Sequence, residues 1–129
     1  MTEVVRVNIP AIVAIVDDDA AIRLATASLV RSLGWPARTF ASAEEFLGSG
    51  DVGNTSCLIS DIRMPGMSGV DMYLHLIGLG IAPATIFITA FPTVSLQAEI
   101  RASGALVLLE KPVDATVIAH WLDVAMCRP

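Results

Sequence analysis

The chain has 129 residues, of which 54% are hydrophobic and 16% charged, with a formal net charge of −5. This composition fits one globular domain and excludes a disordered chain, while the lack of a Lys/Arg cluster argues against nucleic-acid binding by this segment. The apolar runs are strand-sized, so we expect no membrane span. The N-terminus lacks the pattern of a secretory signal, which favours a cytoplasmic location. Cys57 and Cys127 form no disulfide or metal-ligand pattern, and we interpret both as packing residues.

Strands and helices are expected to alternate along the chain. The strands are short apolar runs of the kind buried on both faces of a sheet, and the helices have apolar residues at helical spacing. The predicted strands are Ala11–Val16, Trp35–Phe40, Cys57–Asp61, Thr85–Thr89 and Ala105–Leu109. The predicted helices are Ala20–Leu33, a short one capped by Ser42, one from Ser68 to Gly78 or Gly80, Thr93–Ser103, and one capped by Asp114 with Val117, Ile118, Trp121, Leu122 and Ala125 on one face; Gly48–Asn54 is a predicted loop.

This alternation predicts the fold class. Short right-handed crossovers between successive strands give a parallel sheet with helices on both faces. We therefore expect an α/β protein with a five-stranded, doubly wound parallel sheet. The domain is predicted to span residues 10–127, after an N-terminal extension of residues 1–9.

Polar side chains stand where four of the predicted strands end: Asp17 with Asp18, Asp61, Thr89 and Lys111. The carboxyl ends of parallel strands meet at one edge of a sheet, so these groups should lie together. Close carboxylates repel one another unless a cation or a divalent metal is present, and oxygen ligands favour Mg²⁺. Each residue alone has an ordinary explanation, such as a helix-capping Asp or a solvated Lys, so the prediction depends on all of them occurring in order.

Four motifs give the chain a family resemblance. They are Asp17-Asp18, the run Asp61-Ile-Arg-Met-Pro-Gly-Met-Ser-Gly, Ile88-Thr89-Ala90 and Glu110-Lys111-Pro112. Together they resemble the receiver domain of bacterial two-component response regulators, from about Ile12 to Ala125. Ser42–Leu47 and Glu110–Asp114 look most like the FixJ-type branch. The resemblance implies the (βα)5 flavodoxin-like receiver fold and a phosphorylation-controlled switch, not an enzyme in the usual sense.

The resemblance also implies roles for individual residues. Asp61 would accept a phosphoryl group from a sensor histidine kinase or a phosphotransfer protein. Mg²⁺ would be bound by Asp18, Asp61 and the backbone carbonyl of Arg63, with Asp17 holding a metal-bound water. Two further groups, Lys111 and Thr89, would contact the phosphoryl oxygens.

The implied output is a change on the face formed by the fourth helix, fifth strand and fifth helix. That face would promote a homodimer and control transcription through an attached or partner output domain. The family carries an aromatic residue in the fifth strand where this chain has Leu108, which puts an aromatic rotamer switch in doubt. Whether the chain is a whole regulator or part of a longer one stays open.

Three other functions compete with the switch as interpretations of the sequence. A binding module that no longer takes phosphate is disfavoured by the intact set of polar strand ends. A phosphatase with an aspartyl nucleophile would need a second acid at Arg63. A flavodoxin-like cofactor binder would need a phosphate-binding loop where Asp17–Ala21 is acidic.

Overall fold

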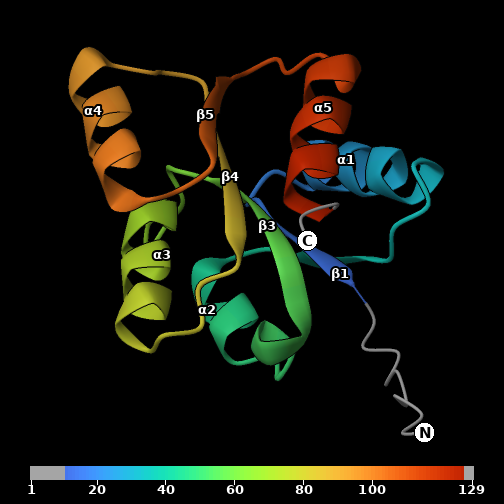
Figure 1. Ribbon diagram of the computed structural model, residues 1–129, viewed down its shortest axis with the longest axis horizontal. Coiled ribbons are helices and arrows are strands. Elements are labelled where there is room, and N and C mark those ends of the chain that lie inside the picture. Colours follow the sequence, from blue (N-terminus) through green and yellow to red (C-terminus); the bar gives the residue numbers. More distant parts are fainter. Residues whose placement is uncertain (1–10, 127–129) are drawn as a thin grey trace, which may run out of the picture.

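The computed structural model describes residues 11–126, which form a five-stranded parallel sheet covered by helices (Figure 1). The strand order is β2-β1-β3-β4-β5, which confirms the predicted doubly wound α/β fold. The strands are β1 (Ile12–Val16), β2 (Ala37–Phe40), β3 (Thr55–Asp61), β4 (Ala84–Thr89) and β5 (Val107–Glu110). The predicted N-terminal extension, residues 1–9, and residue 127 lie outside the described residues.

Helices cover both faces of the sheet. They are α1 (Ala20–Ser32), α2 (Ala43–Leu47), α3 (Gly69–Gly78), α4 (Val94–Ser103) and α5 (Ala115–Met126), together with a 3₁₀ helix, η1 (Val52–Asn54). Helices α1 and α5 pack on one face, while α2, α3 and α4 pack on the other (Figure 1). Because every strand is parallel, all five strands end at the same edge of the sheet.

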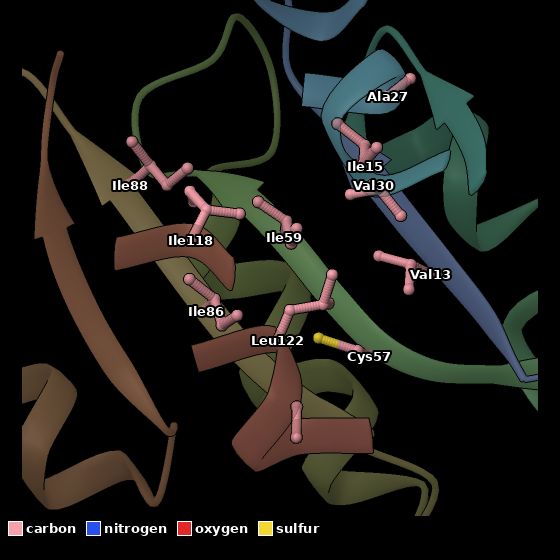
Figure 2. Close-up of a cluster of buried hydrophobic side chains, with 11 residues drawn as sticks. Val13, Ile15, Ala27, Val30, Cys57, Ile59, Ile86, Ile88, Ile118 and Leu122 are labelled. Carbon is pink, nitrogen blue, oxygen red and sulfur yellow. The ribbon is translucent and has the colours of Figure 1, made fainter. Parts of the chain in front are cut away.

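A hydrophobic cluster fills the space between the sheet and helices α1 and α5 (Figure 2). Ile15, Ile59 and Ile86 occupy paired positions on three neighbouring strands, and Leu122 of α5 packs against this row. Cys57 is fully buried in the same cluster, and burial raises the pKa of its thiol to about 12. Because a thiol with so high a pKa is not a nucleophile at neutral pH, Cys57 is a packing residue, as predicted.

The second strand is shorter than predicted. We expected it to begin at Trp35, but it begins at Ala37. The N–H of Trp35 still bonds to the carbonyl of Val30 at 3.3 Å, and Pro36 has no N–H to give to the sheet. Trp35 therefore belongs to the exit from α1, whereas the Pro36 carbonyl already accepts the N–H of Val13 in β1 at 2.9 Å. The apolar character of Trp35 made it look like a strand residue in the sequence.

Further predictions differ from the structure, and one is the third strand, which begins at Thr55, two residues earlier than predicted. The fifth strand begins two residues later than predicted, because the N–H of Ala105 bonds to the Ser103 hydroxyl and so closes the end of α4. The predicted loop Gly48–Asn54 contains η1. Val117, expected on the buried face of the last helix, is 37% exposed.

Candidate functional site

The carboxyl edge of the sheet brings the predicted polar side chains together. Asp17 follows β1, Asp61 ends β3, and Lys111 follows β5. The ammonium of Lys111 lies 3.1 Å from Oδ2 of Asp61 and 3.3 Å from Oδ2 of Asp17. One cation therefore bridges two acids that come from neighbouring strands, as the strand-end pattern predicts.

Asp18 completes a group of three carboxylates. Asp17, Asp18 and Asp61 each offer an oxygen atom, and these atoms lie within 4.8 Å of one another. Asp17 and Asp61 are 4% and 8% exposed, whereas Asp18 is exposed to solvent. Clustered carboxylate oxygens with one solvent-facing side match the ligand set of a hard divalent cation that keeps several waters.

Burial and charge act in opposite directions on this group. Burial raises the pKa of Asp61, the Lys111 ammonium lowers it, and the charge of Asp17 raises it, with a net upward shift. For Lys111, burial lowers the pKa, but the two carboxylates together outweigh burial and raise it. The ammonium is therefore held in its charged form, while the charge of Asp61 is unfavourable in the folded chain.

The loop between β1 and α1 is fixed by its own hydrogen bonds. Oδ1 of Asp17 accepts the N–H of Asp19 at 2.9 Å, and Asp19 in turn caps α1 by accepting the N–H groups of Ala21 and Ile22. Arg23 reaches back from α1 and donates to the carbonyl of Asp17 at 2.7 Å. These bonds leave Oδ2 of Asp17 directed at Lys111. Sequence reasoning did not find the role of Arg23.

The turn after β3 packs tightly against Asp61. The Ser60 hydroxyl donates to the Asp61 carbonyl at 2.8 Å, and the N–H of Gly69 donates to the Ile62 carbonyl at 2.9 Å. A Cβ atom at Gly69 would collide with the carbonyl oxygen of Asp61. Only a glycine lets α3 begin this close to the end of β3.

Thr89, the last residue of β4, and Arg63, on the loop after β3, lie beside this group. Thr89 follows Ile88, the residue of β4 that pairs with Asp61, and its buried hydroxyl accepts the N–H of Phe91 at 3.3 Å. The guanidinium of Arg63 stacks over the ring of Phe91, 5.5 Å from its centroid. The loops after β3 and β4 are therefore in contact through the side chains of Arg63 and Phe91.

The chain matches the response regulator receiver domain model over residues 13–123. The chain belongs to this family. Receiver domains are phosphorylation switches, not classical enzymes, and the acid cluster of Asp17, Asp18 and Asp61 is typical of their Mg²⁺ site.

Individual relatives agree with this assignment. Nodulation protein W of Bradyrhizobium diazoefficiens is 38% identical over 119 residues, covering 88% of this chain and 52% of that protein. The transcriptional regulatory protein FixJ of Azorhizobium caulinodans is 38% identical over 114 residues, covering 88% and 54%. The crystal structure of FixJ-N superposes with a TM-score of 0.81 at 35% identity, over 92% of this chain and 95% of that one. The receiver chain thus spans about half the length of the curated relatives it matches.

One feature that the family resemblance leads us to expect, an aromatic residue in β5, is absent from this chain at Leu108. Leu108, which replaces the family's aromatic residue, pairs with Phe87 of β4, and Phe87 packs edge-on against Tyr73 with ring centroids 5.5 Å apart. The aromatic groups next to β5 therefore come from β4 and α3.

Among residues 11–126, no helix combines the length and apolar character that a bilayer span requires.

Proposed function

We propose that Asp61 accepts a phosphoryl group from a phosphohistidine of a sensor kinase or phosphotransfer protein. A carboxylate oxygen of Asp61 attacks the phosphorus, an O–P bond forms, and the P–N bond to the donor histidine breaks. The observation that supports this proposal best is the 3.1 Å ion pair between Asp61 and Lys111 within the acid cluster. Because a carboxylate is already nucleophilic when ionised, it needs alignment and charge neutralisation more than a general base.

The proposed metal is Mg²⁺, held by Asp18, Asp61 and the backbone carbonyl of Arg63, with Asp17 holding a metal-bound water. Three carboxylates and one ammonium leave two negative charges, which one divalent cation would cancel. When bound, Mg²⁺ supplies the positive charge that an incoming anionic phosphoryl group requires.

Two side chains would stabilise the phosphorylated state. Lys111 already has its ammonium beside Asp61 and would pair with a phosphoryl oxygen as a point charge. Thr89 would donate its hydroxyl to a second oxygen, and the backbone N–H groups of Arg63 and Ala90 would bind the group as well. Because the Thr89 hydroxyl now accepts the N–H of Phe91, this movement would repack the loop between β4 and α4.

A protein phosphodonor would cover the groove beside the site. The groove has a volume of about 540 Å³ and a mainly apolar lining, with Ile22 and Leu29 from α1 and Val113 from the loop between β5 and α5. Lys111 forms part of its wall, so the groove is continuous with the acid cluster. A partner that brings a phosphohistidine to Asp61 therefore meets apolar surface next to the charged site. We also propose a cytoplasmic location for this domain, in keeping with a sensor kinase as its partner.

The proposed output is control of transcription through an attached or partner domain. Support comes from the relatives, since FixJ is named a transcriptional regulatory protein and is about twice as long as the matched segment. The switching surface would be the face of α4, β5 and α5.

The test is phosphoryl incorporation from acetyl phosphate, followed by intact-mass spectrometry with and without Mg²⁺. We expect the native chain to gain one phosphoryl group in a metal-dependent way and Asp61→Asn to gain none. Asp71→Asn is the matched control, because Asp71 is an exposed acid in the first turn of α3 and should leave labelling unchanged.

Other outcomes point to different functions. Labelling that persists in Asp61→Asn would show that another residue is the acceptor. No labelling of the native chain, either from acetyl phosphate or from phosphorylated sensor kinases, would favour a binding module that keeps the fold without the phosphorylation.

A further inference from the structure

The turn that follows Asp61 is held from outside by a side chain of α2. Oε2 of Glu44 accepts the N–H of Met67 at 3.0 Å, across 23 residues of sequence. Within the described chain, this is the one hydrogen bond made by the backbone of residues 63–67. The turn therefore depends on Glu44 for its polar attachment.

A glycine leaves room for this carboxylate. Gly66 has a φ of +79°, in the left-handed region, and a Cβ atom there would lie 2.6 Å from Oε2 of Glu44. The turn is thus shaped so that the carboxylate can rest against its backbone. The N–H of Met67 also lowers the pKa of Glu44, so the carboxylate stays ionised at neutral pH.

Apolar packing places α2 beneath the same turn. Met64 is buried in a cluster with Ala43 and Phe46 of α2, and Met67 packs against the edge of that cluster. Glu44 lies between Ala43 and Phe46 in α2 but is itself exposed. The cluster brings α2 and the turn together, and Glu44 then fixes the position of the backbone.

We propose that Glu44 is a positioning residue for the phosphoryl-transfer site, because it fixes the turn that carries the Arg63 carbonyl. This inference depends on the proposed function, which assigns that carbonyl to Mg²⁺. Without Glu44 the turn would move more freely, and binding Mg²⁺ would require it to be ordered first. Weaker metal binding, and not a loss of the fold, is the expected effect.

The experiment measures Mg²⁺ affinity by isothermal titration calorimetry and hydrogen exchange of the Met67 amide by NMR. In Glu44→Ala, we expect the Mg²⁺ Kd to rise about 3- to 10-fold, the range that one lost hydrogen bond accounts for, and the Met67 amide to exchange faster. Glu44→Gln keeps an acceptor oxygen and should restore most of both properties.

Glu45→Ala is the matched control. Glu45 is an exposed acid in the same short helix, and only its backbone N–H takes part in the Ser42 cap. The Glu45→Ala variant removes the same charge as Glu44→Ala but keeps the hydrogen bond from the Met67 N–H to Glu44. It should therefore leave the Mg²⁺ Kd and the exchange rate of the Met67 amide unchanged. Circular dichroism of each variant shows that the fold is retained.

Three results would overturn the positioning role. In the first, Glu44→Ala binds Mg²⁺ like the native chain or leaves Met67 exchange unchanged. In the second, Glu44→Gln or Glu45→Ala binds Mg²⁺ as weakly as Glu44→Ala does. That result would mean that the loss of negative charge alone weakens Mg²⁺ binding. In the third, the native chain does not bind Mg²⁺ at all, and this result would overturn the proposed metal site together with the positioning role.

Discussion

Asp61 combines two properties that oppose each other. It must be ionised to act as the proposed nucleophile, yet it is buried and has a second carboxylate beside it. The Lys111 ammonium offsets only part of this cost, because burial still raises the pKa of Asp61 above its usual value. The charged form of Asp61, the proposed acceptor, therefore lowers the stability of the fold until a further cation binds beside it.

This balance predicts how Asp61→Asn changes stability with pH. Because folding raises the pKa of Asp61 above 3.8, the unfolded chain releases this proton first, and stability falls as pH rises through the pKa of the folded carboxyl. Asp61→Asn should therefore have a higher Tm than the native chain at pH 7 without Mg²⁺, and the difference should shrink toward pH 3. Thermal unfolding followed by circular dichroism measures it; a lower Tm for the variant at pH 7 would contradict the charge argument.

The central part of the site could be predicted residue by residue. Asp17, Asp61 and Lys111 each follow an apolar run, and the ends of parallel strands must meet. Arg23 and Glu44 could not be predicted in this way, because their contacts depend on how long side chains cross loops. Such contacts leave no periodic pattern in the sequence.

At the level of elements, the connection from β3 to α3 is the tightest part of the site. Gly69 begins α3 with its Cα against the Asp61 carbonyl, and Ser68 caps the helix by accepting the N–H of Asp71. Asp61 and the first turn of α3 are therefore held as one unit. A substitution at the start of α3 should therefore also disturb Asp61.

Gly69→Ala tests this coupling. The added methyl group should cost about 1–3 kcal/mol of unfolding free energy, as overpacking does elsewhere, and should slow labelling of Asp61. Gly78→Ala is the control, because nothing lies within 4 Å of a Cβ atom there and alanine is the better helix former. Urea unfolding measures both variants; equal stability of the two would mean that the β3 to α3 contact yields easily.

Element types could be predicted from apolar patterns, whereas several element ends could not. The start of β2 and the start of β5 both depend on hydrogen bonds that close the preceding helix. Those bonds use Trp35 and Ala105, which are apolar residues and look like strand from their type alone. Residue type therefore predicts which kind of element forms, whereas the hydrogen-bond partners of the backbone determine where that element ends.

On the scale of the whole molecule, the two faces beside the site differ. The groove between α1 and α5 borders Lys111, whereas the loop before α4 presents Phe91 and the first residue of α4 is Val94, and these side chains are 63% and 85% exposed. One face is thus suited to a phosphodonor and the other to an output partner. The proposed homodimer would use the second face.

Val94→Glu tests the proposed dimer. Val94 is the first residue of α4, where an acid is favourable to the helix, so the variant should fold and accept phosphoryl groups normally. In sedimentation velocity with acetyl phosphate and Mg²⁺, we expect the native chain to dimerise and Val94→Glu to bind its copy at least about tenfold more weakly. Leu24→Glu, an exposed position on α1, should dimerise like the native chain. Equal dimerisation of Val94→Glu and the native chain would place the interface elsewhere.

The ion pair between Asp17 and Lys111 joins residues 94 positions apart. During synthesis, β1 and β3 leave the ribosome before residue 111, so the ammonium that pairs with Asp17 and Asp61 is made after both acids. A chain that stops short of residue 111 therefore lacks the cation of both ion pairs. Translation itself delays the competent switch until the last strand has emerged.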